Sequence, residues 1–146
     1  MFYDKGTFSG GWRYLEAAPL ETEFMADWGA YQKDVTGTVR VVGGGKRNTE
    51  LIVEFLRQSK ETGKAAQLCA SLNFDGFSDW FLPSRDELDL MYENLKGKGL
   101  GSFGSRFYWS SSQDDTIDAF IQSFYDGRVN FAHKYFTYSV RAIRAF

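Results

Sequence analysis

The sequence predicts an α+β fold, on three observations along its 146 residues. Strand-like segments come first, amphipathic helical patterns follow in the middle, and a second group of short strand-like segments fills the C-terminal part. Because the strands and helices form separate blocks, without strand–helix–strand alternation, we expect antiparallel pairing. The length suits one domain with its own core, and we expect that domain to span residues 1–146.

The first strand-like segments are residues 11–19 and 36–42, separated by a less regular stretch that contains Trp28. Both segments read as short strands. The chain also opens in a strand-like pattern, which is typical of a domain excised from a longer protein. The glycine run at residues 43–45 ends this strand block.

Two helical patterns follow the glycine run. Asn48 is expected to cap the first helix. Its apolar face is formed by Leu51, Ile52, Phe55 and Leu56. The second pattern repeats at i, i+3, i+4 and i+7 through Ala65, Leu68, Cys69 and Leu72. Gly63 either separates these two helices or lies inside one longer helix.

A third helix is the clearest local prediction. Ser84 and Glu87 have the spacing of a capping box, and Pro83 precedes them. The apolar stripe that follows consists of Leu88, Met91, Tyr92 and Leu95, and Lys96-Gly97 is expected to end the helix.

The C-terminal block reads as short strands at "RFYWSSS", "AFIQSFYDGRVNFAH" and "YSVRAIRAF". Asp126-Gly127 lies inside the second of these and is a strong signal for a two-residue hairpin turn. With 18% aromatic residues and 15 glycines, the composition agrees with many short strands and tight turns around packed rings. Among these rings we expect Trp12, Trp80 and Trp109 to be buried.

Composition also limits the function. The net charge of −2 offers no basic surface for nucleic acid or for an anionic membrane. No apolar run reaches the roughly eighteen residues of a membrane-spanning helix, so we expect no direct membrane insertion. Cys69 is the single cysteine, which excludes an internal disulfide and argues against a cysteine metal cluster.

The motif-like segments carry little chemistry. "GLGSFG" (residues 99–104) follows a helix and precedes a strand, the reverse of a dinucleotide-binding turn, and "GGGKRN" (residues 43–48) lacks the hydroxyl of a phosphate loop. Ser110–Ser112 and His133 could supply a catalytic serine and base, but no nucleophile elbow surrounds the serines. Asp114, Asp115 and Asp118 could offer oxygens to calcium, although a solvated loop explains them better. We therefore expect no enzyme, no metal and no cofactor.

Several segments in order carry a resemblance to a known family. They are "FYDKGTFSGGWRYLEAAP", "DGFSDWFLPSRDELDLMYENL", "YWSSS", "AFIQSFYDG" and "YSVRAIRAF". Over nearly its whole length the chain resembles the C-terminal domain of the Legionella collagen-like adhesin family. The resemblance implies a C-type-lectin-like fold of the formylglycine-generating-enzyme type. In that fold about two main helices support a twisted antiparallel sheet, and a block of short strands lies at the C-terminal end of the chain. The outer face of the sheet binds a ligand. It also implies an exported parent protein on a cell surface or virion.

The chain is similar, more narrowly, to variable proteins of diversity-generating retroelements. In these proteins a fixed frame alternates with rewritten positions. That likeness implies a framework (residues 1–107) and a ligand-displaying segment (residues 108–146). The implied ligand-binding residues are Tyr108, Gln113, Asp114, Asp115, Asp118, Ser123, Tyr125, Arg128, Asn130, Phe131, His133, Tyr135, Phe136 and Thr137.

The aromatic residues near the C-terminus fit either a core or a binding face. Alternation places Val129, Phe131 and His133 on one side of a strand, which could pack on helices or face a ligand. Tyr135 and Phe136 are adjacent and cannot both point inward on a regular strand, so the cluster favours binding.

The leading hypothesis is a non-enzymatic receptor-recognition or adhesion module for a protein or glycan ligand. The alternatives are a constant adhesin domain that binds host polysaccharide, a hydrolase that uses His133, and a structural cap for a longer parent chain.

Overall fold

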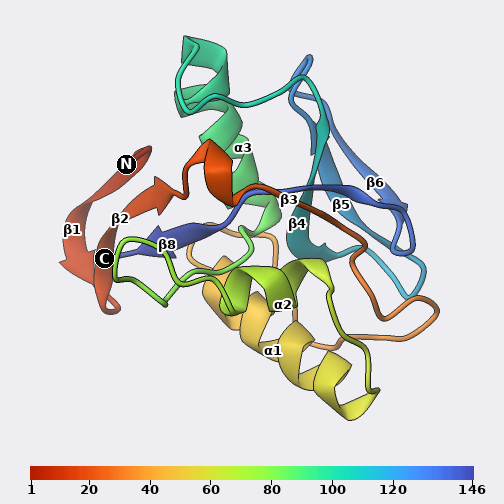
Figure 1. The fold of residues 1–146 in the computed structure, drawn as a ribbon. Coiled ribbons are helices and arrows are strands. Elements are labelled where there is room, and N and C mark those ends of the chain that lie inside the picture. The colour runs from red at the N-terminus through yellow and green to blue at the C-terminus, as the bar shows by residue number, and fades with distance from the viewer.

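The computed structural model describes residues 1–146, folded into three α-helices and two sheets (Figure 1). The three-stranded sheet has the order β1-β2-β8, from Tyr3–Ser9, Trp12–Ala17 and Ile143–Ala145. The five-stranded sheet has the order β3-β7-β4-β5-β6. Its strands are Phe24–Ala26, Tyr138–Val140, Phe107–Gln113, Asp118–Ser123 and Val129–His133. The fold is therefore α+β, as the separate blocks of strands and helices predict.

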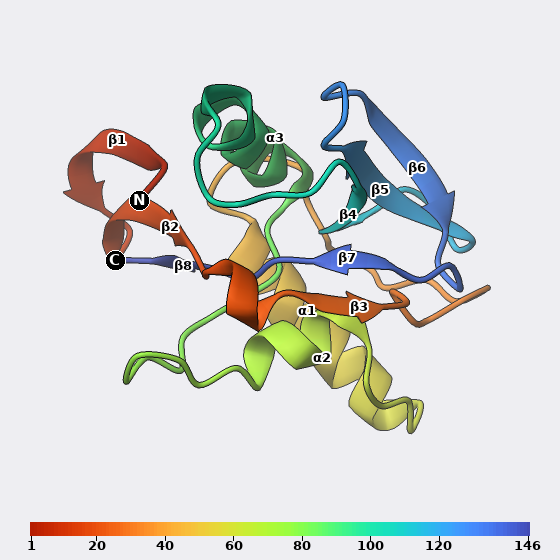
Figure 2. The same cartoon turned by 45° about the horizontal axis from the view of Figure 1, so that its top comes forward.

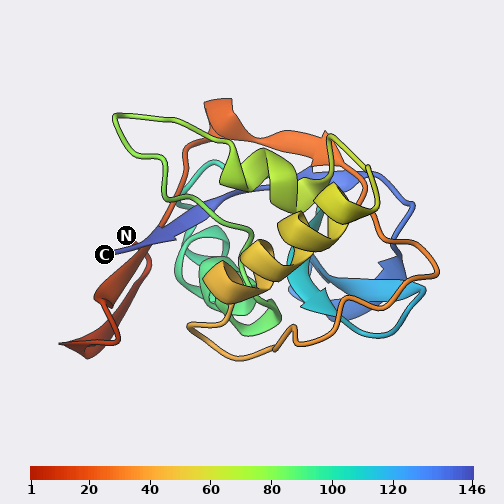
Figure 3. The same ribbon diagram turned by 90° about the horizontal axis from the view of Figure 1, so that it is seen from below.

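The strands at the chain ends meet in the small sheet. β2 lies between β1 and β8, so the N- and C-terminal residues lie at the same end of the molecule (Figure 3). In the large sheet, β7 and β3 pair antiparallel and lie side by side (Figure 2). β4 and β7 are parallel, so the sheet is mixed and the expectation of purely antiparallel pairing is wrong at this one junction.

The helices are α1 (Gly45–Gln58), α2 (Ala65–Ala70) and α3 (Arg85–Asn94). α1 packs against α2 and β4, α2 packs against β3, and α3 packs against β4 and β5. Gly63 separates the first two helices. The three helical patterns in the sequence are thus all present as helices, and α2 is the shortest of them, with six residues.

The capping box of α3 is present as predicted. The Glu87 backbone N–H donates to Ser84 Oγ (3.3 Å), and the Ser84 N–H donates to Glu87 Oε2 (2.7 Å). The Glu87 carboxylate also accepts a hydrogen bond from the Gly43 N–H (2.8 Å). A side chain on Gly45 would overlap Glu87, so this part of the glycine run permits a close approach between α1 and α3.

Two hydrophobic clusters form the core. One contains Trp28, Trp109 and Leu56, and the other contains Tyr108, Phe124 and Met91. Tyr108 and Trp109 are consecutive on β4 and enter opposite clusters, as alternation along a strand requires. β4 is thus buried on both faces, while β6 lies at the outer edge of the sheet (Figure 1).

The predicted strand at residues 36–42 is wrong, because this segment is a turn and an irregular connection. Its backbone groups bond to side chains from elsewhere in the chain. Asn48 accepts from the Val39 N–H (2.8 Å) and donates to the Val39 carbonyl (2.7 Å). Ser112 Oγ donates to that same carbonyl (2.8 Å). Asn48 therefore lies inside α1 as a bridge, and α1 begins at Gly45 instead of at an Asn48 cap.

Three smaller expectations also need correction. Trp80 and Trp109 are buried as predicted, but Trp12 is only half-buried, because it lies on the small outer sheet. Leu95, whose place in the apolar stripe predicts a buried side chain, is half-buried at the end of α3. The hairpin at Asp126-Gly127 exists, but β5 ends at Ser123 and β6 begins at Val129, so its turn is wider than two residues.

Candidate ligand-binding face

The crowded aromatic residues of the C-terminal segment lie on the protein surface. Phe131 is 53% exposed, Tyr135 is 49% exposed and Phe136 is 44% exposed. β6 carries Phe131 at the sheet edge, and the turn from β6 to β7 carries Tyr135 and Phe136. The side chains that meet here form what we call the aromatic surface. It consists of Tyr31, Phe107, Phe131, His133, Tyr135, Phe136 and Tyr138.

Most of these rings contact one another in a continuous chain. Tyr31 meets Tyr135 edge-on at 4.8 Å between ring centroids, and Tyr135 lies 4.8 Å from Phe136. Phe136 stacks on His133 at 5.9 Å and lies 6.0 Å from Tyr138. Such contacts hold each ring in place before any ligand arrives.

Tyr138 connects this surface to the core. Its ring lies 5.2 Å from the ring of Trp109, which is completely buried. The Trp109 indole N–H donates to the Ala26 carbonyl at 3.0 Å. The aromatic surface is therefore connected to the buried core through the contact between Tyr138 and Trp109.

A shallow groove of about 310 Å³ crosses the face between β6 and the β6–β7 turn. Its lining combines apolar rings with a few polar groups: Phe107, Asp118, Ile121, Asn130, Phe131, Ala132, His133, Phe136 and Tyr138. An apolar lining with a small number of polar groups is typical of sites that bind a ligand side chain or ring.

The acidic loop between β4 and β5 is bonded at its ends. Asp118 Oδ1 lies 2.6 Å from His133 Nδ1, which fixes the imidazole beside the groove. Asp115 Oδ1 accepts hydrogen bonds from the backbone N–H groups of Asp118 (2.8 Å) and Ile117 (2.7 Å), and these bonds lower the pKa of Asp115. Asp114 pairs with Arg40 at 3.4 Å.

Lys134 anchors the opposite side of the loop. Its ammonium is buried and donates to Gln113 Oε1 (2.7 Å) and to the Lys33 carbonyl (2.9 Å). It also lies 4.9 Å from the Trp28 ring centroid. Burial lowers the pKa of Lys134 to about 8, against the opposing effect of nearby carboxylates such as Asp115.

Three residues expected to bind ligand are buried or are hydrogen-bonded to other parts of the chain. Tyr108 is buried, and its hydroxyl donates to Glu23 Oε2 at 2.8 Å. Burial and that carboxylate raise the pKa of Tyr108. Ser123 is buried in the sheet. The Gln113 amide is committed to the Val35 N–H and to Lys134. These three support the surface from inside because strand alternation and the Lys134 contact turn them inward.

The other expected residues are at or near the surface. Tyr125 is 79% exposed in the β5–β6 turn. His133 and Asp118 are half-buried beside the groove. The remaining exposed positions are Asp114, Asp115, Arg128, Asn130 and Thr137, together with the rings already described.

Tyr31, Phe107 and Tyr138 belong to the aromatic surface but were not among the expected ligand-binding residues. Phe107 is two residues from Trp109 on β4 and so shares its side of the strand, which is a signal in the sequence. Tyr31 lies in an irregular segment and reaches Tyr135 only through the fold. No local pattern predicts that contact.

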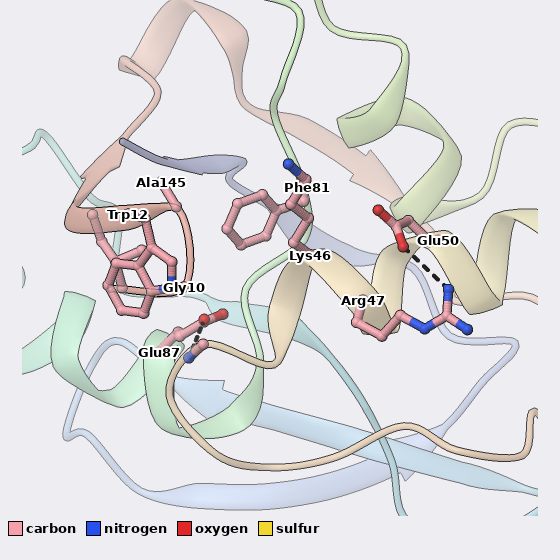
Figure 4. A pocket seen from close by; sticks show the side chains of 10 residues that line it. Gly10, Trp12, Lys46, Arg47, Glu50, Phe81, Glu87 and Ala145 are labelled. Carbon is pink, nitrogen blue, oxygen red and sulfur yellow. Dashed lines mark hydrogen bonds and ion pairs between the residues drawn. The ribbon is translucent and has the colours of Figure 1, made fainter. Parts of the chain in front are cut away.

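A second concavity lies on another part of the molecule, between the β1–β2 hairpin and the start of α1 (Figure 4). It has a volume of about 220 Å³, and Trp12, Phe81 and Lys46 line it. Arg47 pairs with Glu50 at 3.2 Å at its rim, and Glu87 bonds to the Gly43 N–H within it (Figure 4). None of the expected ligand-binding residues lies there.

The groups considered for catalysis or metal binding are placed as follows. The Ser110 hydroxyl donates to the Phe120 carbonyl (2.8 Å), Ser112 donates to Val39, and Ser111 accepts from Asn48 (3.1 Å). All three serines are buried. The structure contains no group of three or more His, Cys, Asp or Glu side chains arranged to hold a metal ion. None of its helices has the length and apolar character needed to span a bilayer.

The fold and this face define an α+β module with a preformed aromatic surface. The family model described as the Lcl C-terminal domain matches residues 23–144, and the chain belongs to that family. No curated protein matches the chain. Among solved structures, a fimbrial protein from Bacteroides ovatus is similar with a TM-score of 0.51 and 20% identity. The match covers 70% of this chain and 24% of that protein, so this chain spans about a quarter of its length.

Proposed function

We propose that this protein is a non-enzymatic binding module of C-type-lectin-like fold that recognises a protein or glycan on a target surface. The observation that carries the proposal is the aromatic surface, where exposed rings rest on a buried base through the Tyr138–Trp109 contact. Large rings held in fixed positions give contact area at low entropic cost. Membership in the Lcl C-terminal domain family supports an adhesion role. Under this proposal residues 1–146 act as one unit, with residues 1–107 as framework.

The partition of buried and exposed residues supports a finer proposal, that the module is the variable protein of a diversity-generating retroelement. In the family pattern Ala119, Phe124, Lys134 and Arg141 belong to the fixed frame, and all four are buried, whereas the frame residue Asp126 is exposed in a turn. Most of the positions expected to vary are exposed. Sequencing this gene from many isolates tests the proposal, since substitutions should concentrate at the exposed positions. Uniform substitution along the chain, or an invariant C-terminal segment, would favour a constant adhesin domain.

A screen for binding tests the broader function. We expect that a ligand found on immobilised peptide or glycan libraries binds the parent at least about tenfold more tightly than the double variant Tyr135→Ala, Phe136→Ala. Phe8→Ala is the matched control, because Phe8 is an aromatic residue 70% exposed on β1. A ligand that loses affinity equally in both variants, or in neither, would contradict binding by the aromatic surface.

The 2.6 Å contact between His133 and Asp118 favours a second candidate, a hydrolase, because such a pair orients a general base. Turnover of ester or glycoside substrates that disappears in His133→Ala would establish it. The stacking of His133 on Phe136 supports a structural use of the imidazole instead.

A further inference from the structure

Strand β6 is a free edge of the five-stranded sheet. It pairs with β5 alone, and its five residue pairs run from Asp118↔His133 to Gln122↔Val129 without a register shift. It has no proline, and both Val129 and Phe131 are exposed. β1, an edge of the small sheet, has a register irregularity instead. A regular and exposed edge is a template for another strand, whereas a bulge blunts it.

The outward backbone groups of β6 follow from its pairing. Ser123 N donates to Arg128 O and Lys134 N donates to Ile117 O, both at 2.9 Å. The even-numbered residues of β6 therefore bond to β5, and alternation turns the N–H and C=O groups of odd-numbered residues away from it. The groups that point outward belong to Val129, Phe131 and His133.

Two of the outward groups have local partners. Phe131 N donates to Asn130 Oδ1 (2.8 Å), and Phe136 N donates to the His133 carbonyl (3.0 Å). The Val129 N–H and C=O, the Phe131 C=O and the His133 N–H are left free for a strand at this edge.

The groove lies beside β6 on the face of the sheet and reaches β4 and β5 through Phe107, Asp118 and Ile121. Its lining includes residues 130–133 of β6, and Phe136 and Tyr138 provide apolar rings across from them. Asn130 and Ala132 line the groove together with Phe131 and His133, and the side chains at positions 130 and 132 are small. A side chain from an added strand would therefore reach the rings.

The end of the edge nearest His133 is acidic. The carboxylates of Asp34, Asp115 and Asp118 lie close enough to Lys134 to act on its ionisation, and Lys134 is the buried cation among them. Asp34 and Asp115 both have lowered pKa values, caused by hydrogen bonds from Gln113 and from the backbone respectively, and so stay charged at neutral pH. This charge complements a basic side chain.

We propose that the ligand is an extended peptide that adds a strand to β6. Its backbone pairs with Val129, Phe131 and His133, an apolar side chain enters the groove, and a basic side chain lies toward Asp115 and Asp118. This inference rests on the proposed binding function and narrows it. Main-chain bonds at an edge combined with a side-chain pocket constitute a known mode of peptide recognition. A second copy paired through β6 fits less well, because it would present Asn130 and Ala132 to the groove and leave the rings uncovered.

A proline at position 129 tests the edge directly. Val129→Pro removes an outward N–H and places a ring in the path of an added strand, while the ladder to β5 keeps its bonds. Val129→Ala keeps the N–H and is the matched control. The probe is an immobilised library of random ten-residue peptides, selected on the parent protein. We expect the selected peptide to bind Val129→Pro at least about tenfold more weakly than Val129→Ala, because the two variants differ in the outward N–H.

A second measurement uses only the parent protein, so it does not depend on the folding of a variant. N-methylation at successive positions of the selected peptide should abolish binding at alternate residues, since only every other N–H of an added strand faces β6. Hydrogen exchange of the Val129 and His133 amides should slow when the peptide is added. Unchanged exchange, or tolerance of N-methylation at every position, would overturn the proposal.

Other outcomes separate this inference from the proposed function. One such outcome is a glycan ligand that binds Val129→Pro but no longer binds the Tyr135→Ala, Phe136→Ala variant. It would overturn the proposal of a peptide ligand and leave the proposed binding function intact. If the parent protein forms a dimer and Val129→Pro does not, the edge of β6 pairs with a second copy of the chain. That outcome would overturn the proposal of a peptide ligand. If the Tyr135→Ala, Phe136→Ala variant binds every ligand as tightly as the parent does, both the peptide proposal and the proposed binding function are overturned.

Discussion

The Lys134 ammonium donates a 2.7 Å hydrogen bond to Gln113 Oε1 and so joins the end of β6 to the end of β4 beneath the acidic loop. The same ammonium donates to the Lys33 carbonyl at 2.9 Å, which holds the segment that carries Tyr31. One buried cation therefore connects three parts of the proposed binding face. Its side chain is buried, and its hydrogen bonds fix segments whose other residues are exposed.

Replacing Lys134 by alanine should destabilise the protein substantially. Lys134→Ala leaves the Lys33 carbonyl oxygen without its donor and opens space beside Trp28, for a loss of about 2–4 kcal/mol in the free energy of unfolding. Lys33→Ala removes only a partly exposed ion pair to Glu61 and should cost about 1 kcal/mol or less. Urea denaturation of both variants measures this. Equal losses would contradict the anchoring role of Lys134.

The ionisation of Lys134 should make stability depend on pH in the alkaline range. Its pKa is about 8 in the folded protein and near 10.5 in the unfolded chain. Above pH 8 the folded state loses this proton before the unfolded state does, so the unfolded state binds more protons and the contribution of Lys134 to stability rises from pH 8 toward pH 10.5. This contribution to stability is lost as the pH falls through the folded-state pKa of about 8. A ¹³C NMR titration of the Lys134 side chain should show a midpoint near 8, and a midpoint above 10 would refute the burial argument.

Tyr108 should contribute to stability and leave ligand binding unchanged. Its hydroxyl bonds to Glu23, which is also paired with the buried Arg141 at 2.7 Å. Tyr108→Phe removes one bond to a charged group and should lower the free energy of unfolding by about 1–2 kcal/mol. Affinity for a ligand of the aromatic surface should stay within about twofold. A large loss of affinity with unchanged stability would place Tyr108 in the binding site after all.

The turn between β5 and β6 depends on Gly127. This residue has φ +80, and a Cβ here would overlap the Tyr92 ring on α3. Gly127→Ala should therefore cost the left-handed backbone penalty of about 1–2 kcal/mol and a further 1–3 kcal/mol or so from overpacking. Gly76 has a similar φ of +78 with open space around it, so Gly76→Ala should show only the first cost. Thermal denaturation of the two variants separates the cost of the left-handed backbone from the cost of overpacking against Tyr92.

The sequence predicts best those features that local bonds decide. The capping box of α3 needs only Ser84 and Glu87, three residues apart, and it forms as expected. The segment at 36–42 has strand-like alternation, but its backbone bonds go to side chains of Asn48, Ser84 and Ser112. Those partners come together only in the folded chain, so alternation alone gave the wrong element.

The same distinction applies to the binding face. Adjacent Tyr135 and Phe136 could not both be buried on a strand, and both are exposed. Tyr108 was expected at the surface from its place in a family pattern, yet its neighbour Trp109 occupies the other side of the same strand and both sides are covered. β4 is buried on both faces because other elements of the fold pack against each face. No short sequence motif specifies that packing. Tyr31 joins the surface for a similar reason.

We propose that the C-terminal rings are displayed on the surface and contribute little to the core. The most direct measurement is the stability of the triple variant Phe131→Ala, Tyr135→Ala, Phe136→Ala beside the parent. With each ring about half exposed, we expect a folded protein and a total loss of about 2–4 kcal/mol. Three packed core rings would cost about 9–15 kcal/mol together, and a variant that fails to fold would contradict the claim.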